Sequence, residues 1–333
     1  MSSEGKMKAA FYEKQGPADE VLKVQEIPIP FPGPGQVRVK IAMSGVNPSD
    51  IKTRTGFTGK MPYPRIIPHQ DGAGVIDMVG ESVENSRLNQ RVWIYEAQYG
   101  RSDGSAAQYV ILDAKQAVSL PDNISLEVGA SLGVPAITAH YCLFADGDIR
   151  DKKILVQGGA GAVGEAVILL AKWAGAWVAA TVRDINDKQS VLSKRADLVI
   201  HLGSENIEDE IRKATHGAGV SKIVEVDLAA NYKVDVRCLD NAGVISTYSV
   251  SSPEQIVPVP LLDLIKRNVT LRFAYVYAIP ENYKIKAVTD INRCLTDGKY
   301  KPTIGQIYPL QQIDQAHKAV EMRKVKGKIL ISL

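Results

Sequence analysis

Three glycines spaced as G-x-G-x-x-G separate an apolar segment, residues 153–156, from a helical pattern. At such a site the first glycine permits a tight turn, and the second lets the backbone approach a pyrophosphate. The third lets the helix pack closely on the strand. The helix N-terminus offers unpaired N–H groups and the positive end of its dipole to phosphates. We therefore expect this turn to bind a dinucleotide through Gly159, Ala160, Gly161, Ala162, Val163 and Gly164.

The chain around the glycine turn alternates short apolar segments with helical patterns. Strands are expected at 153–156, 177–182, 198–200, 223–226 and 244–247. Helices are expected at 162–173, where Ala, Leu, Ile and Val dominate, and at 207–215, which is amphipathic. This alternation is typical of βαβ units and a parallel sheet. It predicts a Rossmann-type doubly wound domain, the alternative being a glycine turn with a purely structural role.

Arg183 comes directly after the predicted strand 177–182, about 20 residues past the glycines. In this fold an acidic residue at that place binds the ribose 2′-hydroxyl of NAD, whereas an arginine accommodates the 2′-phosphate of NADP. Arg183 and Lys188 therefore favour NADPH over NADH. Two alternatives stay open. Asp184 would serve NAD if the strand ended two residues later, and the two cations would be a solvated loop if they bind no phosphate.

The composition is that of an ordinary globular protein of 333 residues, a length that indicates about two domains. A net charge of +3, spread evenly, argues against nucleic-acid binding. The chain lacks a run of about 18 apolar residues, which argues against a membrane span. Residues 1–7 lack the apolar core of a signal peptide. The three separated cysteines indicate a reducing compartment, which we expect to be the cytoplasm.

The first 125 residues have the texture of a compact β domain, with many glycines and prolines between short strand patterns. Alternation of polar and apolar residues predicts strands at 36–41, 75–79 and 91–95. Toward the end of the chain a strand is expected at 271–276, and helices are expected at 283–295 and 313–322. The apolar segment 328–333 must pair inside a sheet, so we expect it to return to the first domain.

Several motifs in the same order resemble the medium-chain dehydrogenase/reductase superfamily, and within it the zinc-independent NADPH:quinone oxidoreductases related to zeta-crystallin. They are residues 32–37, 45–50, 68–76, 129–136, 158–164 and 316–328. The resemblance implies a GroES-like β domain, formed by 1–126 and 270–333, and a Rossmann-type NADPH-binding domain, formed by 127–269. It also implies an active site between the domains and a homodimer formed through the Rossmann domain.

Zinc-dependent relatives in this superfamily carry a cysteine where this chain has Asn47, and a His-Glu pair where it has Gln70-Asp71. A third ligand, a cysteine near Gly133, is also missing. Catalytic zinc needs three ligands drawn from Cys, His or carboxylate side chains. Of these positions only Asp71 supplies one, so we expect metal-free chemistry.

Asn47 and Lys52 are the candidate catalytic residues. The Asn47 amide is able to donate to an acceptor oxygen, and its counterpart in the family faces the nicotinamide; an Asn before Pro48 is equally a good turn residue. Lys52 stands where many relatives have Tyr, and it would stabilise an anionic product or supply a proton, unless it is simply solvated. The resemblance adds Thr138 beside the nicotinamide, and Arg323 and Lys328 reaching toward the cofactor from the C-terminal segment.

These observations predict an NADPH-dependent quinone oxidoreductase that transfers a hydride without a metal. An alkenal or enone reductase on the same scaffold is the alternative enzyme. A weakly catalytic NADPH-binding protein, structural or associated with nucleic acid, is the lesser alternative.

Overall fold

The computed structural model describes residues 5–323 and 325–333, and the chain forms two compact units. The first unit comprises residues 1–134 and 302–333, and the second comprises residues 135–301. The boundaries predicted from the sequence are at 126 and 270 instead. The difference arises because strand β13 (Thr270–Phe273) pairs in parallel with β12 (Leu239–Thr247) and thereby extends the sheet of the second unit.

A six-stranded parallel sheet forms the centre of the second unit, with the order β10-β9-β8-β11-β12-β13. Its other strands are β8 (Lys153–Val156), β9 (Trp177–Val182), β10 (Leu198–His201) and β11 (Val220–Glu225). The strand order reverses between β8 and β11, which are neighbours in the sheet although β9 and β10 separate them in sequence. This is the doubly wound Rossmann-type order, so the predicted fold is confirmed.

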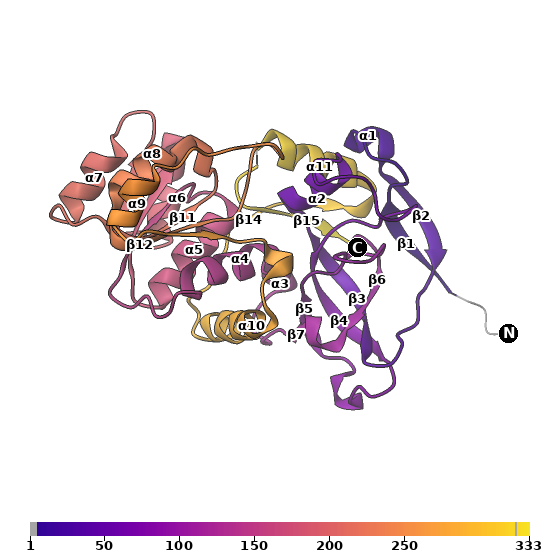
Figure 1. The fold of residues 1–333 in the computed structure, drawn as a ribbon. Helices are drawn as coiled ribbons and strands as arrows, with labels where there is room; N and C mark the ends of the chain where they lie inside the picture. Colours follow the sequence, from indigo (N-terminus) through magenta and orange to yellow (C-terminus); the bar gives the residue numbers. More distant parts are fainter. Residues whose placement is uncertain (1–4, 324) are drawn as a thin grey trace. The chain divides into compact units, whose positions relative to one another are not determined.

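Helices cover both faces of this sheet, as right-handed crossovers on either side of the reversal require. They are α4 (Gly133–Phe144), α5 (Ala162–Trp173), α6 (Lys188–Ser193), α7 (Ile207–Ala214), α8 (Leu228–Cys238), α9 (Leu261–Lys266) and α10 (Glu281–Thr296). In Figure 1, α7 and α8 lie on one side of the sheet, and α5 and α10 lie on the other. Helix α5 is almost entirely apolar because it packs on β8 and β9.

The first unit is built on a seven-stranded sheet with the path β14-β15-β3-β4-β5-β7, and β6 pairs with β3. Its strands are β3 (Gln36–Gly45), β4 (Asp71–Val79), β5 (Arg91–Ile94), β6 (Tyr109–Asp113), β7 (Ala117–Ser119), β14 (Ile304–Pro309) and β15 (Lys328–Ser332). The ribbon of β1 (Lys6–Phe11) and β2 (Lys23–Pro28) lies beside it. Three short helices and α11 complete the unit: α1 (Ala18–Val21), α2 (Pro48–Arg54), α3 (Leu126–Ala130) and α11 (Ile313–Met322).

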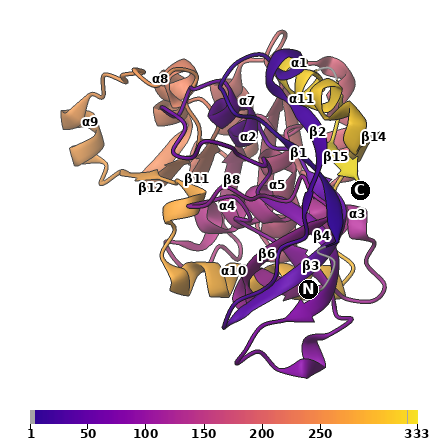
Figure 2. The same cartoon turned by 90° about the vertical axis from the view of Figure 1, so that its right-hand side faces the viewer.

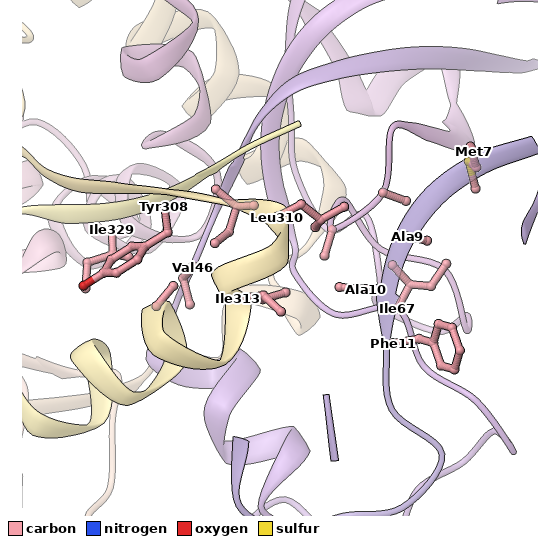
Figure 3. Close-up of a cluster of buried hydrophobic side chains, with 14 of the residues drawn as sticks. Met7, Ala9, Ala10, Phe11, Val46, Ile67, Tyr308, Leu310, Ile313 and Ile329 are labelled. Carbon is pink, nitrogen blue, oxygen red and sulfur yellow. The ribbon is translucent and has the colours of Figure 1, made fainter. Parts of the chain in front are cut away.

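The C-terminal strand returns to the first unit, as predicted, because β15 pairs antiparallel with β3. Figure 3 shows why the strand stays there: Met7 and Phe11 from β1, Ile313 from α11 and Ile329 from β15 belong to one buried apolar cluster with Val46. Burying each such side chain contributes roughly 1.5–3 kcal/mol. This cluster fixes the position of β15, which begins at Lys328.

Candidate active site

The glycine turn begins directly after β8. Gly158 has a φ of +78°, in the left-handed region that glycine tolerates best, so Gly158 makes the tight turn. The sequence pattern predicts this role for Gly159 instead. A Cβ on Gly159 would instead lie 2.8 Å from Cβ of Ala180 on β9. Gly159 is therefore required for packing against the neighbouring strand.

Gly161 and Gly164 differ in the space around them. A Cβ on Gly164 would lie 2.2 Å from the carbonyl oxygen of Gly158, so the helix packs too closely here for any side chain. A Cβ on Gly161 would meet nothing nearer than that same oxygen, at 3.5 Å. Gly161 is the N-cap of α5 and has no side chain to cover the first-turn N–H groups. The turn thus fits a pyrophosphate held by backbone N–H groups.

The predicted phosphate-binding cations lie in the segment that follows β9, with Lys188 at the start of α6. This strand ends at Val182, as expected, and Arg183 follows as an exposed residue. Lys188 forms an ion pair with Glu205 at 2.8 Å. The carboxylate of Asp184, the alternative for NAD, accepts the backbone N–H of Asn186 at 2.9 Å. Arg183 is therefore better placed than Lys188 to meet a ribose phosphate at this strand end.

The other two predicted cofactor residues lie on different units. Thr138 is buried within α4, in the second unit. Arg323 is an exposed residue of the first unit and ends α11 with a φ of +52°. Arg323 and the glycine turn therefore belong to different units.

In the first unit, Asn47, Asp71 and Lys328 form a buried polar cluster. Asn47 is the N-cap of α2, Asp71 begins β4, and Lys328 begins β15. Nζ of Lys328 lies 3.0 Å from Oδ2 of Asp71 and 2.5 Å from Oδ1 of Asn47. Nδ2 of Asn47 donates to Oδ2 of Asp71 at 2.7 Å. Lys328, which the resemblance directs toward the cofactor, is 4% exposed and bound within this cluster.

Asp50 is bonded to Asn47 of this cluster and is not among the residues predicted from the sequence. Its carboxyl accepts the backbone N–H of Asn47 at 2.7 Å, as the third residue of a helix commonly does for its N-cap. Burial, reinforced by the negative charge of Asp71, raises the pKa of Asp50 to about 8. The cluster therefore includes a carboxyl that holds its proton near neutral pH.

Lys52, the second catalytic candidate, lies outside the cluster. It is a half-buried residue of α2 whose Nζ lies 4.7 Å from the centre of the Phe57 ring, a cation–π geometry.

A chain of hydrogen bonds with defined donors and acceptors ends on the backbone carbonyl oxygen of Asp71. Ser105 donates to the carbonyl oxygen of Asp71 at 2.6 Å, so the Ser44 hydroxyl must donate to Ser105, at 2.8 Å. Nδ1–H of His69 therefore donates to Ser44, and Nε2 of His69 accepts from Nε2–H of His317 at 2.9 Å. One tautomer of each histidine satisfies every bond.

Both histidines are neutral in this arrangement. Burial, together with the positive charge of Lys328, lowers the pKa of His69 to about 3. Burial also lowers the pKa of His317 well below its ordinary value, and the positive charges of Arg54 and of a protonated His69 would act in the same direction. The pair is structural: it ties α11 and the start of β4 together.

The residues at the positions of the zinc ligands do not fit zinc. Asn47 and Asp71 direct their oxygens at the Lys328 ammonium, and Oδ1 of Asp71 accepts the backbone N–H of Val134 at 2.8 Å. A Cβ on Gly133 would lie 2.1 Å from Oδ1 of Asp71, so no side chain fits at that position. These lone pairs already bind hydrogen-bond donors, and an ammonium would repel a cation. Across residues 5–323 and 325–333, no group of three or more His, Cys, Asp or Glu side chains is arranged to hold a metal ion.

Comparison with known proteins agrees with the fold. The alcohol dehydrogenase GroES-like domain matches residues 33–122, and the zinc-binding dehydrogenase domain matches residues 195–331. The chain belongs to the medium-chain dehydrogenase/reductase superfamily of oxidoreductases. It is 28% identical over 327 residues to the quinone oxidoreductase of Mus musculus, covering 97% of this chain and 96% of that protein.

Two solved structures with the same fold as this chain are described with different cofactors. An NAD-dependent alcohol dehydrogenase has a TM-score of 0.87 and 26% identity, covering 98% of this chain and 100% of the other. A mycobacterial protein complexed with NADPH has a TM-score of 0.85 and 23% identity, with the same coverage. The preference for NAD or NADP must therefore be argued from the residues of this chain.

No helix in the described part of the chain combines the length and apolar character needed to cross a bilayer. The three cysteines, Cys142, Cys238 and Cys294, are buried free thiols.

Proposed function

We propose that this superfamily member is an NADPH-dependent quinone oxidoreductase that needs no metal. The observation that carries the proposal is the Lys328 ammonium bound to Asn47 and Asp71, at the positions where zinc-dependent relatives have ligands. The similarity to the quinone oxidoreductase of Mus musculus supports the choice of acceptor. The buried free thiols favour a reducing compartment, so we place the protein in the cytoplasm.

The proposed binding residues each have one task. The glycine turn, from Gly159 to Gly164, holds the pyrophosphate through backbone N–H groups at the start of α5. Arg183, with Lys188 a turn later, binds the 2′-phosphate that distinguishes NADPH from NADH. Thr138 and Arg323 are proposed to contact the remainder of the cofactor. The bound nicotinamide would supply the hydride from its C4 carbon.

Asn47 and Lys52 are proposed to serve the acceptor. Nδ2 of Asn47 carries two hydrogens and Asp71 accepts one of them, so the second is the donor that Asn47 offers to an acceptor oxygen. Lys328 and Asp71 fix the orientation of that amide. A preorganised donor stabilises the negative charge that develops on the acceptor oxygen after hydride transfer.

An alkenal or enone reductase is the alternative function, because saturating a conjugated double bond also places negative charge on an acceptor oxygen. The test is NADPH oxidation measured with a panel of quinones and a panel of enones in the same assay. Faster turnover of quinones supports the proposal, and faster turnover of enones supports the alternative. Tight NADPH binding with no turnover of either panel would leave only the weakly catalytic NADPH-binding protein.

We also propose that two copies associate through the edge of the parallel sheet. Strand β13 ends the sheet, and Phe273 on it is 73% exposed. Helix α9, at the margin of this unit in Figure 2, exposes Leu262 and Ile265. Sedimentation should give a dimer for the wild type and a monomer for Phe273→Glu. Ile185→Glu, at an exposed apolar position elsewhere on the unit, should remain dimeric.

A further inference from the structure

A second buried chain of hydrogen bonds runs from the glycine turn into the core of the second unit. The backbone N–H of Gly158 donates to Oγ1 of Thr181 at 3.0 Å. The single hydroxyl hydrogen of Thr181 is donated to Oε1 of Gln157 at 2.8 Å. The amide nitrogen of Gln157 must therefore face Asp235, and it donates to Oδ1 of Asp235 at 2.7 Å. The turn is thus linked to a carboxyl on α8.

The far end of this chain holds a second carboxyl, that of Glu225, which ends β11. The side chains of Asp235 and Glu225 are fully buried and within hydrogen-bonding reach of each other. Both oxygens of Glu225 accept from Nδ2 of Asn231, at 3.0 and 3.2 Å, and one also accepts the backbone N–H of Asp227. Glu225 has the donors that an ionised carboxylate requires.

Oδ2 of Asp235 has a different environment. It is buried, and none of the described residues donates a hydrogen bond to it. A buried oxygen without a partner is costly, and two touching carboxylate charges in the interior are costlier still. A proton on Oδ2 removes both penalties, since the acid then donates to Glu225.

We propose that Asp235 is a neutral carboxylic acid that donates to the Glu225 carboxylate, and that this buried proton holds the glycine turn in its dinucleotide-binding conformation. The inference rests on the proposed cofactor binding. Each group in the chain, from Gly158 to Asp235, then donates to the next one, and the last hydrogen bond is accepted by the Glu225 carboxylate. Asp235 is accordingly a positioning residue, which acts on the cofactor through Gln157, Thr181 and Gly158.

The surroundings of the pair favour the protonated acid. Burial first, and then the charge of Glu225, raise the pKa of Asp235 well above its ordinary value. The titratable groups that act on the pair from neighbouring elements are Asp227, Cys238 and Tyr248. Burial raises the pKa of both Cys238 and Tyr248, so each stays neutral, and Asp227 adds further negative charge.

Loss of this proton is expected to weaken cofactor binding. It would place a second negative charge behind the turn that receives an anionic pyrophosphate, and it would break the link to Glu225. Affinity for NADPH should therefore fall as pH rises through the titration of the pair. Because linkage is reciprocal, NADPH binding in that pH range should take up protons from the buffer.

Asp235→Asn is the informative variant, because its amide reproduces the neutral acid: the oxygen accepts from Gln157 and the nitrogen donates to Glu225. We expect this variant to bind NADPH as the wild type does in calorimetry, with no proton uptake from the pair. It should also lose a carboxylic-acid C=O band from the infrared spectrum of the cofactor-free protein. Asp240→Asn, at an exposed aspartate nearby, is the control and should retain that band.

Thr181→Val breaks the chain without touching the acid. It should weaken NADPH binding at least about tenfold, the cost of leaving a buried donor and acceptor unpaired, and should retain the infrared band. Asp235→Ala should weaken binding as much, and Thr181→Val replaces it as the test if Asp235→Ala does not fold. The proposal is overturned if Asp235→Asn binds as poorly as Thr181→Val, if Thr181→Val binds normally, or if the infrared spectra of the wild type and Asp235→Asn show no difference in the carboxylic-acid C=O region. Wild-type protein that shows the band and binds neither NADPH nor NADH would refute the proposed function. The role of the proton in cofactor binding would then be refuted as well, while Asp235 would still be assigned as the acid.

Discussion

Nζ of Lys328 lies 3.0 Å from Oδ2 of Asp71, although the two residues are 257 positions apart in the chain. The contact forms because β15 pairs with β3, and β3 pairs with β4, which begins at Asp71. Strand pairing thus places the Lys328 ammonium beside the Asp71 carboxylate, which would otherwise be a buried negative charge without a cationic partner. The same ammonium orients Asn47, the proposed donor to the acceptor oxygen.

Removing the cation should strongly destabilise the protein. Lys328→Met leaves the Asp71 carboxylate buried without its partner, which costs about 3–5 kcal/mol in the free energy of unfolding. Urea unfolding measures this loss. The double variant Lys328→Met with Asp71→Leu should recover most of it, since an apolar pair replaces the ion pair. Lys318→Ala, which breaks an exposed pair with Asp19, should change little. Equal losses in the single and double variants would contradict the account.

The raised pKa of Asp50 should make stability fall as pH rises. In the unfolded chain this carboxyl titrates near 3.8, whereas in the folded protein its pKa is about 8. Between these values the folded state binds more protons, so the free energy of unfolding declines with increasing pH. Asp50→Asn keeps an oxygen for the Asn47 N–H and cannot ionise. Urea unfolding over this range should show the variant gaining on the wild type by a few kcal/mol, on the order expected for such a shift. A stability difference that is independent of pH would show that Asp50 is already ionised.

Two alanine substitutions in the glycine turn should separate binding from folding. Gly161→Ala meets only an ordinary contact at 3.5 Å, so the protein should fold normally while the methyl group blocks the pyrophosphate. Gly164→Ala would place Cβ 2.2 Å from the Gly158 oxygen, so the turn itself must shift and the melting temperature should fall. Calorimetry with NADPH and thermal unfolding measure the two effects. Normal NADPH binding by Gly161→Ala would refute the assignment of the pyrophosphate to this turn.

Arg183 should determine the preference for NADPH. Arg183→Ala removes a charge-assisted hydrogen bond to the 2′-phosphate, worth about 1.5–3 kcal/mol, and should weaken NADPH binding by about 10- to 100-fold. Affinity for NADH should stay unchanged. Arg293→Ala, an exposed arginine on α10, is the matched control. If Arg183→Ala weakens NADPH and NADH equally, the 2′-phosphate is bound elsewhere.

Local sequence was sufficient for much of the fold. Helix α5 and strand β9 have the predicted bounds because each is a nearly continuous apolar segment whose residues are almost all buried. The strand near 270 was found, yet it was assigned to the wrong unit. The sequence of an edge strand has the same pattern whichever sheet it joins. Only the pairing of β13 with β12 assigns it to the sheet of the second unit.

The site was predictable only where it is local. The glycine turn was predicted from its spacing and Asn47 from the family resemblance, whereas the role of Gly158 was missed because a positive φ cannot be inferred from two adjacent glycines. The pairing of Asp71 with Lys328 depends on sheet register and has no local signal. Asp50 did have one: it follows Asn47 by three residues, the spacing at which a helix residue accepts the N-cap N–H.

Direct hydride delivery without a metal is tested most directly by single-turnover oxidation of NADPH, deuterated at the transferred C4 position, with a quinone as acceptor and protein stripped with a strong chelator. The account predicts one NADPH oxidised for each quinone reduced, with a primary isotope effect and a rate equal to that of untreated protein. Loss of transfer after chelation, with recovery on adding zinc, would contradict it.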